Sequence, residues 1–100
     1  MIINVNRLTE YAQITQKICQ DFKIEPYNIS FEEYDYPEIH IQADFKKEIQ
    51  DALLDNVIAK EKQVRIDFWK DEIAIYRRFH LTVDGIKVKI VLTESTKKEN

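Results

Sequence analysis

Several residue types are scarce in this sequence, and each shortage argues against a class of protein. A single glycine severely limits the glycine-rich loops that cradle phosphate groups in nucleotide-binding enzymes. A single cysteine excludes an intramolecular disulfide and zinc sites that need two or four cysteines. Two prolines and one glycine argue against long flexible linkers. With 100 residues, 44% of them hydrophobic, the chain suits one domain with one core.

Long apolar segments are also missing. No run of about 18 apolar residues could form a membrane helix. The first ten residues, MIINVNRLTE, lack the basic start and continuous apolar run of a signal peptide. A lone cysteine fits a reducing compartment, so these features together predict a cytoplasmic protein.

Charge is abundant but unevenly distributed. The chain has 18 acidic and 15 basic residues, a net charge of -3 and a pI near 5.4, which does not favour attraction of the whole domain to nucleic acid or anionic membranes. Residues 21–55 contain ten acids and three lysines, whereas residues 60–90 contain eight basic and five acidic residues. The plainest interpretation is that folding brings these segments together so that their charges offset.

The most clearly patterned stretch is a predicted β-hairpin over residues 73–92. Apolar residues alternate on both arms around Asp84 and Gly85. A two-residue Asp-Gly loop favours a type I′ turn, which matches the natural twist of the strands. This turn predicts a register in which Val83 faces Ile86, and it divides the remaining side chains between two faces of the sheet.

Residues 63–69 alternate in the same way and predict a third strand before the hairpin. We expect a turn that pairs Phe68 with Ile73. In that register Arg65 and Tyr76 would be neighbours on the face that points away from the core.

Periodicity earlier in the chain predicts two amphipathic helices and two further strands. Apolar residues at steps of three and four predict a helix over residues 8–22 and a second over residues 45–61, with Asp44 as its cap. Residues 27–43 have the pattern of two extended segments around a turn at residues 35–37.

These elements predict an α+β domain in which two amphipathic helices pack on one face of a mainly antiparallel sheet that ends in a three-strand meander. We assign residues 1–93 to a single compact domain and residues 94–100 to a flexible polar tail. Residues 2–5 are a candidate short edge strand. Since each helix has one apolar stripe, the other face of the sheet should point outward.

The outward face of the meander is the first candidate site, because it interleaves aromatic and cationic side chains. Such a face suits a protein partner, where Trp, Tyr and Arg often supply much of the binding energy. It also suits single-stranded nucleic acid, whose bases stack on rings while cations meet phosphates. A solvated face, or one covered by the acidic hairpin of residues 30–38, is the plainer alternative. The candidate partner-binding residues are Arg65, Trp69, Tyr76, Arg78, His80 and Lys89, with Lys87 and Val91 beside them.

The second candidate is a row of carboxylates spaced four, three and four residues apart, which places them on one side of the second predicted helix. Their separation of roughly 5 to 6 Å along the axis resembles that of neighbouring phosphates, so the row could imitate DNA or RNA towards a basic enzyme. A solvated helix face is again the plainer alternative. The candidate acidic surface consists of Glu32, Glu33, Asp35, Glu38, Asp44, Glu48, Asp51 and Asp55.

Some isolated residues carry less weight. His40 and His80 are too few, and too distant in sequence, to indicate a metal site. Cys19 lies at the edge of an apolar stripe and is better explained as a small core residue than as a nucleophile. Arg77 interrupts an apolar alternation, and it could extend past the sheet, pair with a carboxylate such as Glu61, or bind a ligand.

We therefore expect a small non-catalytic cytoplasmic protein-binding module that uses either the aromatic-basic sheet face or the acidic surface. An inhibitor, an immunity protein or a phage or mobile-element accessory protein would fit. The alternative is a nucleic-acid-binding module that uses the sheet face. No cofactor, metal or membrane partner is expected. A homodimer that uses an exposed sheet edge is a further alternative.

Overall fold

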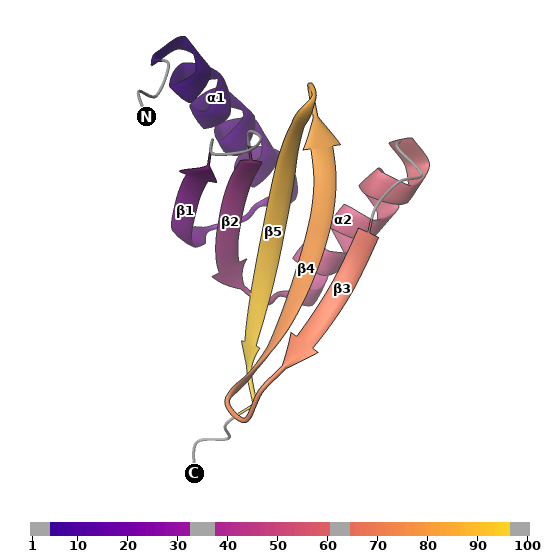
Figure 1. Ribbon diagram of the computed structural model, residues 1–100. Helices are drawn as coiled ribbons and strands as arrows, with labels where there is room; N and C mark the ends of the chain where they lie inside the picture. Colours follow the sequence, from indigo (N-terminus) through magenta and orange to yellow (C-terminus); the bar gives the residue numbers. More distant parts are fainter. Residues whose placement is uncertain (1–4, 33–37, 61–64, 97–100) are drawn as a thin grey trace.

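The computed structural model describes residues 5–32, 38–60 and 65–96, and within them every side chain except those of residues 5–7, 56–60 and 65. The elements are α1 (Val5–Phe22), β1 (Pro26–Glu32), β2 (Glu38–Asp44), α2 (Lys47–Lys60), β3 (Arg65–Lys70), β4 (Ala74–Val83) and β5 (Ile86–Ser95). Both helices lie on the same side of the sheet (Figure 1). The predicted α+β class is therefore confirmed.

The five strands form one mixed sheet in the order β1-β2-β5-β4-β3. The outer pairs β1–β2 and β3–β4, and the pair β4–β5, are antiparallel, whereas β2 and β5 are parallel. The sequence did not predict this central parallel pair. Its two strands are separated by α2, β3 and β4, so no local turn signal marks their contact.

The core lies between the helices and the face of the sheet beneath them, which we call the inner face. Each helix contributes apolar residues three or four positions apart, and the strands contribute every second residue. The buried cluster is Tyr11, Ile14, Ile18, Ile24, Ile39, Ile41, Ala43, Ile49, Leu53, Phe79, Ile86, Val88, Ile90 and Leu92. Within the described ranges no helix is long and apolar enough to cross a membrane.

The predicted hairpin turn and its register are confirmed. Asp84 and Gly85 have φ angles of 51° and 79°, as a type I′ turn requires. Val83 pairs with Ile86, and the ladder continues in this register along β4 and β5. The turn therefore determines which side chains of β4 and β5 face the core.

The predicted register of β3 is wrong, because the turn before β4 forms later in the chain. The Asp71 Oδ1 atom accepts hydrogen bonds from the Ile73 and Ala74 amides at 2.9 and 2.8 Å, and the Asp71 amide donates to the Ala74 carbonyl at 3.0 Å. Phe68 consequently pairs with Arg77 instead of Ile73. A shift by an even number of residues leaves every side chain on its predicted face.

Three predicted boundaries also need correction. Asp44 is the last residue of β2 and not a helix cap; the backbone continues beside β5, where the Phe45 amide donates to the Thr93 carbonyl at 2.8 Å. Residues 94 and 95, which we expected in a flexible tail, belong to β5 because β4 is long enough to pair with them. Val5 belongs to α1 rather than to an edge strand, and residues 2–4 lie outside the described part of the chain.

Candidate functional site

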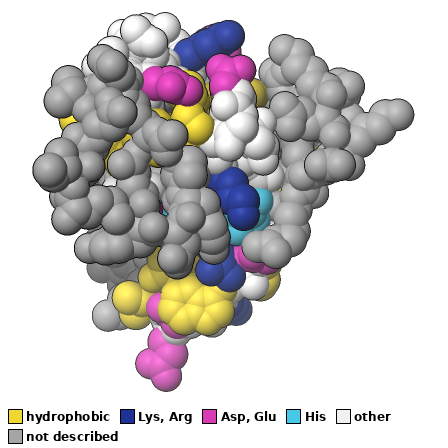
Figure 2. Space-filling view, turned by 45° about the horizontal axis from the view of Figure 1, so that its top comes forward, with side chains coloured by type: hydrophobic (Ala, Val, Ile, Leu, Met, Phe, Trp, Pro, Cys, Tyr) yellow, Lys and Arg dark blue, Asp and Glu magenta, His cyan; other side chains and the backbone are white. Residues whose placement is uncertain are grey.

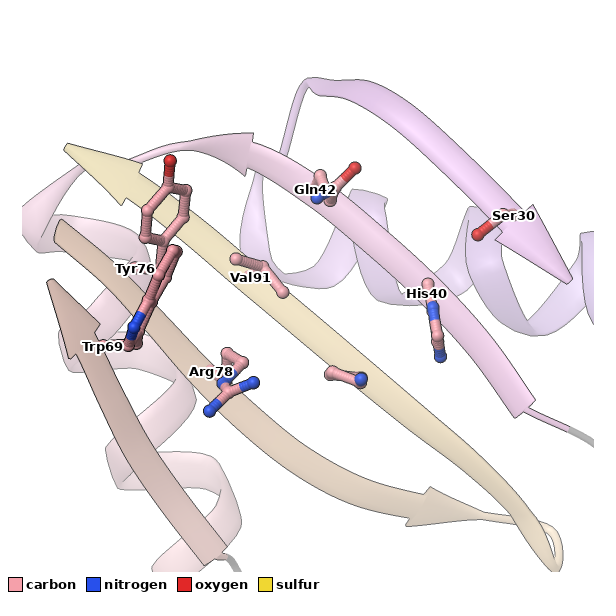
Figure 3. Close-up of a pocket in the computed structure, with 8 residues that line it drawn as sticks. Ser30, His40, Gln42, Trp69, Tyr76, Arg78 and Val91 are labelled. Atoms are coloured by element: carbon pink, nitrogen blue, oxygen red, sulfur yellow. The ribbon is translucent and has the colours of Figure 1, made fainter. Parts of the chain in front are cut away.

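The face of the sheet opposite the helices, here called the outer face, carries a shallow hollow of about 360 Å³. All five strands of the sheet contribute to it, and Figure 3 shows the lining side chains around the hollow. The lining residues are Ser30, His40, Gln42, Trp69, Tyr76, Arg78, Lys89 and Val91. These residues occupy alternate strand positions, which is why all of them share one face.

An aromatic pair forms one end of the hollow. Trp69 and Tyr76 face each other across β3 and β4, and their rings stack with centroids 4.8 Å apart and planes at 27°. The Tyr76 hydroxyl donates a hydrogen bond of 3.4 Å to Asp71. Partial burial and the Asp71 carboxylate raise the pKa of Tyr76. Trp69 remains 53% exposed, so the ring that stacks on Tyr76 is still accessible to solvent.

Asp67 contacts two of the predicted partner-binding side chains, Arg78 and His80. Its Oδ1 accepts a hydrogen bond from Arg78 Nε, and its Oδ2 lies 3.0 Å from His80 Nε2. Partial burial raises the pKa of the Asp67 carboxyl, but the hydrogen bonds from His80 and Arg78 and their charges hold that pKa below its ordinary value. The Arg78 guanidinium is therefore already engaged within the protein.

A second acid-base cluster lies on β1 and β2. His40 Nε2 contacts Glu38 Oε1, and His40 Nδ1 lies 3.7 Å from Glu32 Oε1. Partial burial raises the pKa of Glu38, but the hydrogen bond with His40 and the charges of His40, Lys89 and Lys87 lower it further than burial raises it. Lys89 lies opposite His40 in the β2–β5 register, beside this cluster.

One ligand atom from each of Glu32, Glu38 and His40 lies within 4.8 Å of the others, so these residues could hold a metal ion. The two carboxylates, however, contact different ring nitrogens of His40, whereas a metal ion would take only one of them. The two carboxylates therefore hold the His40 imidazole ring between them. Sequence reasoning missed this cluster, although the alternation Glu38, Ile39, His40 already predicts that the first and third share a face.

The hollow brings together four of the predicted partner-binding residues: Trp69, Tyr76, Arg78 and Lys89. His80 lies farther along β4 and contacts Asp67. Arg65 is opposite His80 in the register, and its side chain lies outside the described atoms.

Three lining residues were not predicted, namely Ser30, His40 and Gln42. They come from β1 and β2, which reach the hollow only through the unpredicted parallel pairing of β2 with β5.

The predicted acidic surface is divided between the two sides of the sheet. Glu32 and Glu38 lie on the outer face, where both contact His40. Glu48, Asp51 and Asp55 are exposed on α2, which covers the inner face. Asp44 is exposed at the end of β2, and the predicted residues Glu33 and Asp35 lie outside the described residues. The carboxylates on the helix are thus a separate and shorter row.

The isolated residues have structural surroundings. Arg77 stacks on the Phe45 ring, with its guanidinium carbon 4.1 Å from the ring centroid, and pairs with Glu94 at 2.9 Å. Glu61, the predicted partner of Arg77, lies outside the described residues. Cys19 packs against the core as predicted, and burial raises the pKa of its thiol.

Figure 2 shows basic and histidine side chains along the middle of the outer face, with hydrophobic side chains gathered at its lower end. The site thus combines an aromatic end with a central region where positive and negative groups alternate. Comparisons with protein-family models, curated proteins and solved structures find no match to this chain, so the candidate site rests on its own geometry.

Proposed function

We propose that this chain is a small non-catalytic protein-binding module of the cytoplasm, and that it holds its partner in the hollow of the outer face. The observation that carries the proposal is that the stacked Trp69 and Tyr76 pair and Lys89 line one hollow. An inhibitor, an immunity protein or a phage or mobile-element accessory protein would use such a surface.

The aromatic end is suited to anchoring a partner. Trp69 is half exposed, yet its ring stacks on Tyr76, whose hydroxyl donates a hydrogen bond to Asp71. A side chain that is already ordered loses little conformational entropy when a partner covers it. Tryptophan and tyrosine are also the residues in which binding energy concentrates at protein interfaces.

The charges around the hollow favour a protein over a nucleic acid. Asp67 neutralises Arg78, and Glu38 and Glu32 flank His40, so carboxylates lie among the cations of this face. Carboxylates would repel a run of phosphates, whereas a protein partner can offer both signs of charge together with apolar groups.

Nucleic acid binding is the second candidate, and the exposed ring of Trp69 beside Arg78 favours it. A base could stack on that ring while Lys89 and Arg78 approached the backbone. Salt separates the two candidates, because several phosphate contacts would make the affinity fall steeply with ionic strength.

A protein partner could instead use the carboxylates on α2. Glu48, Asp51 and Asp55 are all exposed on that helix. The row is shorter than the sequence suggested, since Asp44 belongs to β2, so this form of the proposal has less support than the hollow.

The test is capture of a partner from nuclease-treated lysate of the host by tagged wild type and three variants. Trp69→Ala with Lys89→Glu should lose the partner, because it removes the anchor and reverses a charge in the hollow. Ile73→Ala is the matched control, since Ile73 is equally exposed (56%) but lies in the turn. Full capture by the double variant, or loss only with Glu48→Lys and Asp51→Lys, would contradict the hollow as the binding site.

A further inference from the structure

Within the described ranges, three of the seven exposed large apolar side chains lie on the edge strand β3, and two others, Tyr27 and Ile29, lie on the opposite edge strand β1. Four of the large ones in the described ranges follow one another closely in the chain, namely Ile66, Phe68, Trp69 and Ile73. Phe68 is 60% exposed and Ile66 is 45% exposed, although both occupy inner-face positions of β3. Apolar surface of this kind at a sheet edge calls for an explanation.

The two edges of the sheet differ in their protection against pairing with another strand. β1 begins at Pro26, which has no amide hydrogen, and its register with β2 shifts between Pro26 and Asn28. Proline and bulges are common devices that prevent strand addition. β3 has neither device, and its register with β4 runs without interruption from Arg65 to Lys70.

The hydrogen bonds of β4 show which backbone groups of β3 point outward. The Asp71 amide donates to the Ala74 carbonyl, while the Ile73 carbonyl accepts from Thr96 on the β5 side. Pairs in an antiparallel ladder alternate between hydrogen-bonded and non-hydrogen-bonded. Counting back from Asp71 along the β3–β4 register, Ile66, Phe68 and Lys70 therefore direct their amide and carbonyl groups away from β4. The amide and carbonyl groups of these three residues could therefore form hydrogen bonds with an added strand.

The outward-facing residues are evenly spaced about Phe68, and this symmetry points to the occupant. We infer that two copies of this chain pair through β3, antiparallel and centred on Phe68, so that the two sheets join into one continuous sheet. Phe68 then exchanges backbone hydrogen bonds with Phe68 of the partner subunit, and Ile66 does so with Lys70 of the partner subunit. The outward-facing backbone groups of all three residues are thereby hydrogen-bonded to β3 of the partner subunit.

The side chains are complementary in the same register. Phe68 contacts Phe68 of the partner subunit on the inner face, where both rings are otherwise exposed. Asp67 lies opposite Trp69 of the partner subunit, and Arg65 lies opposite Asp71 of the partner subunit, so like charges do not face each other. Centring the pair on Asp67 would instead place two aspartates in direct opposition.

This dimer is independent of the proposed function, but it would arrange two binding sites. Both hollows would lie on the same face of the continuous sheet, with the two Trp69 side chains near the symmetry axis. Trp69 lies in both surfaces, but Phe68 on the inner face belongs only to the interface and Lys89 on the outer face only to partner capture. Single variants at Phe68 and Lys89 therefore distinguish the two ideas.

The first experiment measures the molar mass of the full chain by size-exclusion chromatography with light scattering over a range of concentrations. The wild type and the control Ile73→Lys should be dimers. Phe68→Lys should be a monomer with an unchanged circular dichroism spectrum, its dissociation constant raised by more than about tenfold, because two cations would meet on the axis. A monomeric wild type, or a Phe68→Lys variant that remains dimeric, would overturn the inference.

The second experiment tests the register by disulfide cross-linking in a Cys19→Ala background. Phe68→Cys should cross-link with itself on mild oxidation, since facing Cα atoms of a hydrogen-bonded pair lie about 5.5 Å apart, within disulfide range. Ile66→Cys is the matched control on the same strand and face. Its two copies would be separated by roughly 13 Å, so it should cross-link only when mixed with Lys70→Cys. Self-cross-linking of Ile66→Cys without that of Phe68→Cys would overturn the proposed pairing.

Discussion

The same strands form both faces of the sheet, but the side chains on the two faces differ in burial and in chemistry. On the inner face, Ile39, Phe79 and Ile90 are almost completely buried beneath the helices. On the outer face, Trp69 is half exposed, and Arg78 is held by Asp67. Burial of apolar surface dominates folding energies, whereas exposed ion pairs contribute little. Stability therefore resides mainly on the inner face, and the outer face can change without loss of the fold.

The largest expected effect comes from opening the inner face. Leu53→Ala should lower the free energy of unfolding by about 2 to 5 kcal/mol, because a fully buried leucine leaves a cavity when it is truncated. Denaturant titration followed by circular dichroism measures this loss. The exposed Ile73→Ala should change the same quantity by less than about 0.5 kcal/mol, and equal losses in the two variants would contradict the assignment of the core.

Truncation on the outer face should separate binding from stability. Trp69→Ala should weaken partner binding by about 2 kcal/mol, roughly thirtyfold, if this ring is the anchor that we propose. Its free energy of unfolding should fall by less than about 1 kcal/mol, since the ring is half exposed and loses mainly its stacking on Tyr76. Titration calorimetry and denaturant unfolding of the same sample measure both quantities. A stability loss as large as that of Leu53→Ala would place Trp69 among the structural residues.

A substitution in the hairpin turn, which determines the face on which each side chain of β4 and β5 lies, should have an intermediate effect on stability. Gly85 has a φ angle of 79°, and a Cβ atom added there would have no neighbour within 4 Å. Gly85→Ala should therefore cost about 1 kcal/mol from backbone strain alone. Thermal unfolding measures this cost. Gly85→Asn should be tolerated better because asparagine enters this conformation more readily, and an Asn variant that is less stable than the Ala variant would contradict a purely conformational origin.

The smallest effect concerns the outer-face ion pairs and depends on pH. The pKa of Asp67 is lower in the folded protein than its ordinary value of 3.8, so its ionised form stabilises the fold above that pH. Asp67→Asn should cost less than about 1 kcal/mol near pH 7, where the pairs with Arg78 and His80 are formed. As the pH falls through the lowered pKa, the wild type loses this advantage and the two unfolding free energies should converge. A difference that grows with acidification would refute the role of this carboxylate.

Local chemistry made part of this fold predictable. Asp84 and Gly85 specify their turn by themselves, so the register of β4 and β5 followed from the sequence. The turn before β4 was misplaced because it depends on the hydrogen bonds that the Asp71 side chain makes to two amides. The register error did not move Trp69 or Tyr76 off the outer face, and the two therefore meet in the hollow.

The other half of the site depends on contacts between distant segments. His40 and Gln42 reach the hollow because β2 lies parallel to β5, and the sequence carries no local signal for that pairing. The described residues of the predicted acidic surface lie on both sides of the sheet, because α2 packs on the inner face whereas Glu32 and Glu38 contact His40 on the outer face. Alternation in a strand or helix shows which residues share a face, but not on which side of the sheet each element packs.

The most direct test of the central claim compares partner capture from nuclease-treated lysate by the wild type, the double variant Trp69→Ala with Lys89→Glu, and the control Ile73→Ala, with each bound protein quantified by mass spectrometry. If the outer-face hollow is the binding site, the wild type and Ile73→Ala will retain the same protein at equal amounts and the double variant will lose it while remaining folded. Equal retention by all three proteins would contradict a binding site in the hollow.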